Sequence, residues 1–292
     1  TSCSVLFYDD EMELFSLTNE CLIFVDMQRG LVLADIKSGE ESVLGQVGKT
    51  YRAPMGNLYD QAGEVVVYSD RIVYKNQDDD LLVMDYDGNQ IVEIPDVVTF
   101  APYQGGLCYV YRSGLLRGEM NLMRMDLNGN FREKLDDHWV YKLQATDDGV
   151  YVVADDYALY RVTGPDVREE LIRPDWFDFA VSNDYIASVT EEGLVILNKN
   201  SGESEVVDGN KGNRILYIEG NTLVYDNGRI NIYNIKERTK FQVNESGTCL
   251  YCGILDDRIW MMFGQFDETT DIAEPERCVF YTADGELICS LE

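Results

Sequence analysis

Runs of neighbouring acids recur along this sequence, and they are the first groups that could do chemistry. They are Asp9-Asp10, Asp78-Asp79-Asp80, Asp136-Asp137, Asp147-Asp148, Asp155-Asp156 and Asp256-Asp257. Glycoside hydrolysis needs two carboxylates that face each other across the substrate. Neighbours along a strand point to opposite faces, so these pairs do not form such dyads. They stand at turns, where we expect their carboxylates to accept hydrogen bonds from backbone amides.

A further group of acids lies within residues 264–277, which we expect to form a long loop. Its acids are Asp267, Glu268, Asp271 and Glu274. A long acidic loop can fold around calcium, so Asp267, Asp271 and Glu274 are the candidate metal ligands. A solvated loop is the alternative. Our expectation is that the protein uses no cofactor, with calcium at this loop as the exception.

Histidine and cysteine chemistry has little support in the sequence. The single histidine, His138, excludes most histidine-based metal sites. Cys249-Leu-Tyr-Cys252 spells C-x-x-C, but it stands in a strand-like run without a second pair. An odd total of seven cysteines scattered through apolar runs is typical of small buried side chains, and we predict no intramolecular disulfide. The sequence contains no P-loop, no G-x-G-x-x-G and no G-x-S-x-G.

The charge balance is strongly acidic, with 24 Lys and Arg against 53 Asp and Glu and a net charge of −29. Such a field repels nucleic acid and anionic lipid, so we exclude both as partners. The excess acid either keeps a large surface soluble or attracts cations and basic partners. No apolar stretch is long enough for a transmembrane helix.

The first residues bear on the compartment. Thr1-Ser2-Cys3 fits the end of a bacterial lipoprotein cleavage box, whose cysteine becomes lipidated. We therefore expect an extracytoplasmic or cell-surface location with a lipid anchor near Cys3. A cytoplasmic location is the alternative.

The elements that must position these groups follow from an internal repeat. Seven segments each end in an apolar strand, a residue that can cap a turn, and a short polar turn. The capping residues are Asp35, Asp85, Asp126, Thr163, Asn198, Asn234 and Thr282. Their short side chains can bond backbone amides one or two residues further on. They recur 35 to 50 residues apart, which is the period of a four-stranded propeller blade.

A second turn recurs earlier in each unit, before another apolar run. The pairs are Asn19-Glu20, Ser69-Asp70, Gly105-Gly106, Asp148-Gly149, Asn183-Asp184, Gly220-Asn221 and Asp256-Asp257. Each unit therefore reads as four strands joined by hairpins. We predict an all-β fold: a seven-bladed β-propeller of four-stranded antiparallel blades, formed by residues 1–292 as a single domain. The expected blades are 4–47, 63–95, 97–136, 140–173, 176–209, 213–245 and 248–292, with 4–8 as either an extra strand or the first strand.

The capping turns also carry a family resemblance. The segments Met84-Asp-Tyr-Asp-Gly88 and Met125-Asp-Leu-Asn-Gly129 resemble the blade turns of TolB-like and uncharacterised bacterial surface β-propellers. The resemblance covers the whole chain as an architecture, and the motif is structural. It implies a propeller at the bacterial surface and implies no particular activity.

The expected ligand site follows from where the units are longer than the repeat needs. In a four-stranded unit the connections between strands one and two, and between three and four, share one end, which we call the hairpin end. The remaining connections share the other end, which we call the loop end. Residues 48–62, 113–120 and 264–277 are insertions at the loop end, and insertions on one face of a repeat array often mark the functional side.

Aromatic and cationic residues near these insertions are the candidate ligand-binding set, because such residues dominate interface hot spots. They are Tyr51, Arg52, Tyr59, Tyr103, Arg112, Arg117, Trp139, Trp176 and Phe177. We predict a non-catalytic binding module for a protein, peptide or glycan. One alternative is a propeller enzyme of the lactonase or glycosidase type with acids around the central channel. Another is a structural subunit of an envelope complex. The sequence leaves the oligomeric state open.

Overall fold

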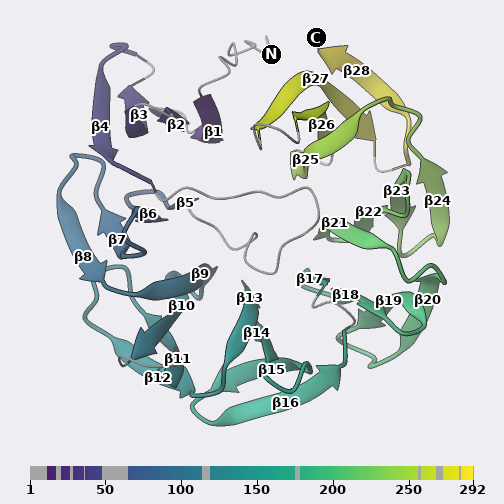
Figure 1. Cartoon of the computed structure of the whole chain (residues 1–292), viewed down its shortest axis with the longest axis horizontal. Coiled ribbons are helices and arrows are strands. Elements are labelled where there is room, and N and C mark those ends of the chain that lie inside the picture. The colour runs from purple at the N-terminus through teal and green to yellow at the C-terminus, as the bar shows by residue number, and fades with distance from the viewer. Residues whose placement is uncertain are drawn as a thin grey trace. The chain divides into compact units, whose positions relative to one another are not determined.

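The computed structural model describes residues 12–17, 21–26, 29–35, 37–47, 65–113, 119–174, 178–255, 258–267, 272–282 and 284–291. Its regular structure consists of seven four-stranded antiparallel sheets, and no described residue is helical. Within each sheet the four strands lie in chain order or its exact reverse, so each sheet is a simple meander (Figure 1). The predicted number and kind of sheets is confirmed.

The first three sheets have these strands. The first contains β1 (Met12–Leu17), β2 (Cys21–Asp26), β3 (Gly30–Asp35) and β4 (Glu41–Gly45). The second contains β5 (Val65–Val67), β6 (Ile72–Lys75), β7 (Leu81–Met84) and β8 (Gln90–Ile94). The third contains β9 (Val97–Tyr103), β10 (Gly106–Ser113), β11 (Glu119–Met125) and β12 (Arg132–Asp136).

The next two sheets follow the same order. The fourth contains β13 (Val140–Thr146), β14 (Gly149–Ala154), β15 (Leu159–Gly164) and β16 (Val167–Ile172). The fifth contains β17 (Phe179–Val181), β18 (Tyr185–Thr190), β19 (Gly193–Asn198) and β20 (Ser204–Asp208).

The last two sheets complete the series. The sixth contains β21 (Arg214–Glu219), β22 (Thr222–Asp226), β23 (Ile230–Asn234) and β24 (Thr239–Gln242). The seventh contains β25 (Thr248–Leu255), β26 (Arg258–Asp267), β27 (Ile272–Thr282) and β28 (Leu287–Leu291).

The chain divides into two compact units. One comprises Thr1–Thr50, Gln61–Leu143 and Gly164–Val167, and the other comprises Tyr51–Asp60, Gln144–Thr163 and Arg168–Glu292. Inside each unit, neighbouring sheets contact through their first strands: β1 contacts β5 in one unit, and β17 and β25 both contact β21 in the other.

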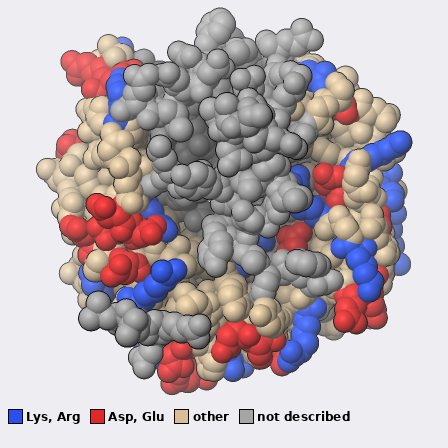
Figure 2. Space-filling view, in the orientation of Figure 1, with Lys and Arg blue, Asp and Glu red and all other residues tan. Residues whose placement is uncertain are grey.

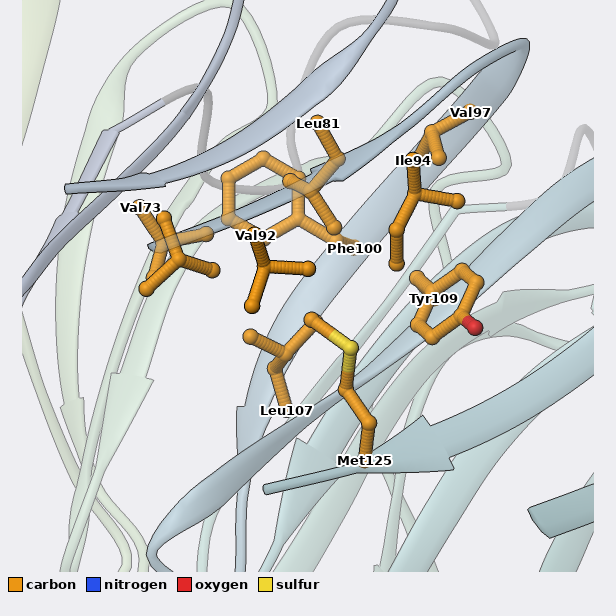
Figure 3. Close-up of a cluster of buried hydrophobic side chains, with 10 residues drawn as sticks. Val73, Leu81, Val92, Ile94, Val97, Phe100, Leu107, Tyr109 and Met125 are labelled. Atoms are coloured by element: carbon orange, nitrogen blue, oxygen red, sulfur yellow. The ribbon is translucent and has the colours of Figure 1, made fainter. Parts of the chain in front are cut away.

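The hydrophobic core lies between the faces of neighbouring sheets. Figure 3 shows one such cluster, in which Val73 and Leu81 of the second sheet meet Phe100, Leu107 and Tyr109 of the third. Equivalent clusters join the first sheet to the second, the fifth to the sixth and the sixth to the seventh. Burial on both faces explains why the middle strands, such as Leu81–Met84, are apolar throughout. The last strands are largely exposed, as in Val167–Ile172.

The turns between third and fourth strands form largely as the sequence indicates. The Asp85 carboxylate accepts hydrogen bonds from the backbone N–H groups of Asp87 and Asn89, at 3.0 and 2.8 Å. Asn198 accepts from Asn200 and Ser201 at 2.9 and 3.0 Å. Asp35, Asp126, Asn234 and Thr282 also accept from backbone amides two to four residues on.

Thr163 is the exception, and its prediction as a capping residue is wrong. It lies inside β15, exposed, because the chain turns through Pro165 and Asp166 alone. Proline fixes its own φ near the value required at the first turn position, and Asp166 adopts the left-handed conformation with φ 55°. A two-residue turn of this kind leaves no extra amide for a capping side chain.

The structure also corrects the expected loop at residues 264–277. Much of it is a long hairpin in which β26 extends to Asp267 and β27 begins at Ile272. Gln265 pairs with Glu274, and Asp267 pairs with Ile272. The insertion lengthens two paired strands, since pairing satisfies backbone groups that a loop would leave to solvent. Residues 113–120 likewise include the ends of β10 and β11.

Some predictions fall on residues outside the described part of the chain. These are the strand proposed at 4–8, the insertion at 48–62 and the lipid anchor at Cys3. The first described strand of the first sheet is β1, and that sheet already has four strands. Among the described residues, none forms a helix of the length and apolarity that crossing a membrane would require.

Candidate functional site

A cavity of about 760 Å³ opens at the hairpin end of the fifth and sixth sheets, entirely within one compact unit. Its walls are two neighbouring turns, Ser182–Asp184 between β17 and β18 and Gly220–Asn221 between β21 and β22. The remaining lining residues are Thr146, Val181, Tyr217, Ile218, Glu219, Thr222, Asn234 and Ile259. Polar groups thus surround a smaller set of aliphatic side chains.

The local sequence explains both turns. Gly220 has φ 51°, a left-handed conformation that glycine adopts without steric cost, and Glu219 then pairs with Thr222. In the other turn, Ser182 exchanges hydrogen bonds with Tyr185: its backbone N–H donates to the Tyr185 carbonyl at 2.9 Å, and its Oγ accepts from the Tyr185 N–H at 3.2 Å. Each turn is therefore fixed by bonds of its own.

The turns between third and fourth strands brace these walls. The backbone N–H of Lys199 donates to the carbonyl of Asp184 at 2.9 Å, and that of Ile235 donates to Asn221 at 2.8 Å. The same relationship therefore holds in both sheets. Backbone bonds of this kind keep the cavity walls in place without a ligand.

A buried ammonium group ties the fourth sheet to the fifth behind the cavity. The side chain of Lys199 is only 5% exposed, and it donates to Asp148 Oδ1 at 2.7 Å, the Ser182 carbonyl at 3.0 Å and Thr146 Oγ1 at 3.3 Å. Its Nζ also lies 4.9 Å from the centre of the Tyr151 ring, within the range of a cation–π contact. Because Thr146 and Ser182 line the cavity, Lys199 positions part of its wall.

The Asp148 carboxylate is held from several sides. Besides Lys199, Thr146 Oγ1 donates to it, the Tyr151 hydroxyl donates at 2.8 Å, and Arg161 Nη1 lies at 3.5 Å. Partial burial acts to raise the pKa of Asp148, but the bonds from Lys199 and Thr146 outweigh it and the pKa is lowered. Burial, with the Asp148 bond second, raises the pKa of the Tyr151 hydroxyl. Both groups thus keep their usual charge states near neutral pH.

First strands are further linked by side chains that reach the next sheet. Gln144 of β13 accepts from the backbone N–H of Val181 at 2.8 Å. Asp178, just before β17, accepts from the N–H of Ile215 in β21 at 2.8 Å. These bonds occupy backbone donors that sheet pairing leaves free and fix the spacing of the cavity walls.

Two carboxylates lie at the cavity, Asp184 and Glu219, and both residues are exposed. Asp184 Oδ1 accepts from the Asn200 amide at 3.2 Å, and Glu219 Oε2 accepts from the Tyr217 hydroxyl at 2.7 Å. Among the described residues that line the cavity there is no Lys, Arg, His or Cys. The described lining therefore carries negative charge, hydroxyls and amides.

The three sequence-predicted ligand residues that the structure describes, Tyr103, Arg112 and Trp139, are not among the described residues that line this cavity. Tyr51, Arg52, Tyr59, Arg117, Trp176 and Phe177 lie outside the described residues. Arg112 is exposed near the loop end of β10, and Trp139 is half-buried just before β13 with its ring 6.4 Å from that of Tyr141. Both stand at the loop end, as expected.

Tyr103 does not stand where the sequence placed it. It ends β9 beside the turn of Gln104 and Gly105, at the hairpin end, and it is 5% exposed. Both turn residues have positive φ, which gives the tight two-residue hairpin that Gly105-Gly106 predicts. Tyr103 and Arg112 therefore lie near opposite ends of the β9–β10 hairpin, so the described residues do not bring them together.

A smaller cavity of about 400 Å³ lies at the loop end of the other unit, between the first and second sheets. Its described lining includes Gly45, Gln46, Tyr74, Asn76 and Asp78, and it does not include Tyr103, Arg112 or Trp139. The role predicted for the nine candidate ligand residues, like the choice between the two ends, stays a prediction.

The structure does not describe the side chains that were predicted to bind a metal. The side chains of Asp267, Asp271 and Glu274 lie outside the described residues, so calcium there stays a prediction. Asp136, Asp137 and His138 form the one described group of three His, Cys or acidic side chains close enough to share an ion. His138 Nδ1 lies 2.5 Å from Asp136 Oδ1, so these two side chains are hydrogen-bonded to each other.

Described charges of both signs are interspersed on the face drawn in Figure 2. Several form pairs, including Arg124 with Glu133, Arg161 with Glu169 and Arg277 with Glu245. The net charge of the protein is thus acidic, although arginines neutralise several of its glutamates.

Comparison with known proteins identifies the fold and leaves the activity open. The computationally designed protein Ika8 superimposes with a TM-score of 0.64 over 96% of this chain and 87% of its own, at 14% identity. BamB from Moraxella catarrhalis gives a TM-score of 0.53 over 84% of this chain and 76% of its own, at 11% identity. With the seven sheets, these likenesses define a seven-bladed β-propeller fold.

A third similar structure is the extracellular domain of the putative one component system BT4673 from B. thetaiotaomicron. It has a TM-score of 0.53 and 14% identity, over 90% of this chain and 37% of its own. No protein-family description and no curated protein matches the sequence. At such low identities the likeness shows the fold alone.

The residues that sequence reasoning missed are Lys199, Asp148, Asp184 and Glu219. Two turn pairs, Asn183-Asp184 and Gly220-Asn221, were recognised as equivalent hairpins of consecutive units. Equivalent turns of neighbouring blades lie side by side. The equivalence of these two turns could therefore have indicated that they face a common cavity.

Proposed function

We propose that the chain is a single, non-catalytic binding domain that takes a segment of a protein, peptide or glycan into the cavity at the hairpin end of the fifth and sixth sheets. The observation that supports this most is a cavity of about 760 Å³ with polar lining residues and walls that backbone hydrogen bonds hold in place. A preformed concave site with a few convergent polar groups is the usual form of a ligand site.

The lining chemistry favours binding over catalysis. Its carboxylates, Asp184 and Glu219, each accept a bond from a neutral side chain. The described lining has no histidine, cysteine or lysine that could act as a base or nucleophile beside them. Binding at the bacterial surface would also suit a fold shared with the extracellular domain of BT4673.

The test is a screen of the full chain on peptide and glycan arrays, with the cavity filled in a variant. Asn221 is exposed on the turn, and only its backbone carbonyl braces the wall, so Asn221→Trp should fold and block the cavity. Glu191→Trp, on the β18–β19 turn at the other end of the fifth sheet, is the matched control.

We expect the screen to yield a ligand whose binding is lost in Asn221→Trp and kept in Glu191→Trp. Ligands that bind equally to both variants would contradict the proposed site. Turnover of a glycoside or lactone by the wild type would contradict the non-catalytic assignment.

A further inference from the structure

The charged residues that are described in the lining of the cavity are all acidic. Its lining holds two carboxylates, Asp184 and Glu219, and the described lining residues include no Lys or Arg. Neither carboxylate has a cationic partner among the described residues: Asp184 accepts from the Asn200 amide, and Glu219 from the Tyr217 hydroxyl. Neutral donors orient a carboxylate, but they do not cancel its charge.

Three other acids of the same unit are paired with arginines. Glu169 is paired with Arg161 at 2.7 Å, Glu205 with Arg238 at 2.9 Å, and Glu245 with Arg277 at 2.9 Å. In a chain with 24 basic residues against 53 acids, cations are in short supply. The pairs named here stand elsewhere, and the structure describes no such pair for Asp184 or Glu219.

The ammonium group of Lys199 behind the cavity wall is already engaged. Lys199 stands behind the wall with its side chain 5% exposed, and its amine donates to Asp148, Ser182 and Thr146. Three acceptors use all three donors of an ammonium group. Lys199 therefore cannot turn to Asp184 or Glu219 without breaking bonds that hold the wall.

From these observations, and resting on the proposed function, we infer that the cavity binds a cationic group, the ammonium or guanidinium of a Lys or Arg side chain in a basic peptide segment. The two carboxylates come from turns of neighbouring sheets and line the same cavity. The side-chain oxygen of Asn221, which also lines the cavity, can accept a further N–H donor. Anionic ligands are disfavoured by both the local acids and the net charge of −29.

The test compares defined probes on the full chain by isothermal titration. The probes are an N-acetylated, C-amidated trilysine peptide, the same peptide with its side chains acetylated, spermidine and a neutral chito-oligosaccharide. Acetylation removes the charge and keeps the length of the side chain. Spermidine separates a requirement for a peptide from a requirement for an amine alone.

Two cavity variants and one matched control complete the design. Glu219→Gln and Asp184→Asn each remove one cavity charge, and Glu192→Gln removes one exposed charge at the loop end of the fifth sheet. We expect the trilysine peptide to bind and each cavity variant to weaken binding about tenfold or more, because a charge-assisted bond is lost. Glu192→Gln should change affinity by less than about twofold.

Several outcomes would overturn the inference. Equal affinity for the acetylated peptide would show that charge is not recognised, and equal weakening by Glu192→Gln would show general attraction to an acidic surface. Tighter binding of spermidine than of the peptide would reject a peptide segment as the ligand. If only the oligosaccharide binds, and Asn221→Trp abolishes that binding, the inference fails while the proposed function stands. Binding that survives Asn221→Trp would reject both.

Discussion

Lys199 Nζ and Asp148 Oδ1 lie 2.7 Å apart, although 51 positions separate the two residues in the chain. Lys199 follows the last residue of β19, and Asp148 stands in the turn between β13 and β14, so the pair joins the fifth sheet to the fourth. The ammonium is buried and the carboxylate is 40% exposed. This partly buried ion pair is therefore one of the contacts that hold the wall of the candidate site.

Removing the Asp148 charge should destabilise the protein, because it leaves the buried Lys199 ammonium without its anion. We expect Asp148→Asn to lower the free energy of unfolding by about 1–3 kcal/mol, less than for a fully buried pair because Asp148 is partly solvated. Urea unfolding measures it. The control is Asp137→Asn, whose partner Lys134 is 46% exposed, and it should lower the free energy of unfolding much less. Equal losses in the two variants would count against the buried pair.

Low pH should lower the free energy of unfolding through the protonation of Asp148. The pKa of Asp148 is lowered in the folded state, so the stability it contributes is present above its ordinary pKa of 3.8 and is lost as pH falls through the folded pKa. The difference in unfolding free energy between wild type and Asp148→Asn should therefore shrink below about pH 4. Urea titrations from neutral to acid pH measure this. A difference that stays constant to about pH 2 would contradict it.

A matched pair of substitutions tests whether the predicted capping residues stabilise their turns. The Asn198 side chain accepts two backbone amides, so we expect Asn198→Ala to cost about 1 kcal/mol. Thr163 is an exposed strand residue before a two-residue turn, and Thr163→Ala should stay within about 0.5 kcal/mol. Thermal or urea unfolding ranks the two. A larger loss for Thr163→Ala would restore the capping role that the structure denies it.

Thiol reactivity should follow burial. Cys289 is exposed, whereas Cys108 and Cys249 are buried. Burial raises the pKa of the Cys108 thiol to about 12, which further suppresses its reaction. In the native protein Cys289 should react first with a thiol reagent, and Cys108 should stay silent. The denatured, unreduced protein should show close to seven free thiols, and five or fewer would reveal a disulfide.

The fold could be predicted because its signals are local. Asp85, Asn198 and the other turn caps act on amides within a few residues, so their spacing reveals the repeat directly. The error at Thr163 arose because Pro165 and Asp166 form a turn that needs no cap. The error at 264–277 arose because a long hairpin and a loop share the same polar composition, and only pairing such as Gln265 with Glu274 separates them.

The candidate site could not be predicted in the same way, because its contacts are distant in sequence. Nothing near Lys199 indicates that its amine reaches Asp148 and Thr146 of another sheet. Asp184 and Glu219 likewise resemble ordinary turn acids until the two hairpins are seen to share a cavity. Insertion length directed attention to the loop end instead, where Arg112 and Trp139 lie.

The most direct test of the binding site is amide chemical-shift mapping of the full chain with a ligand from the peptide and glycan screen. We predict that the largest shifts fall on residues 182–184 and 218–222, which line the cavity at the hairpin end. Shifts confined to the loop end, around Arg112 and Trp139, with residues 182–184 and 218–222 unchanged, would contradict it.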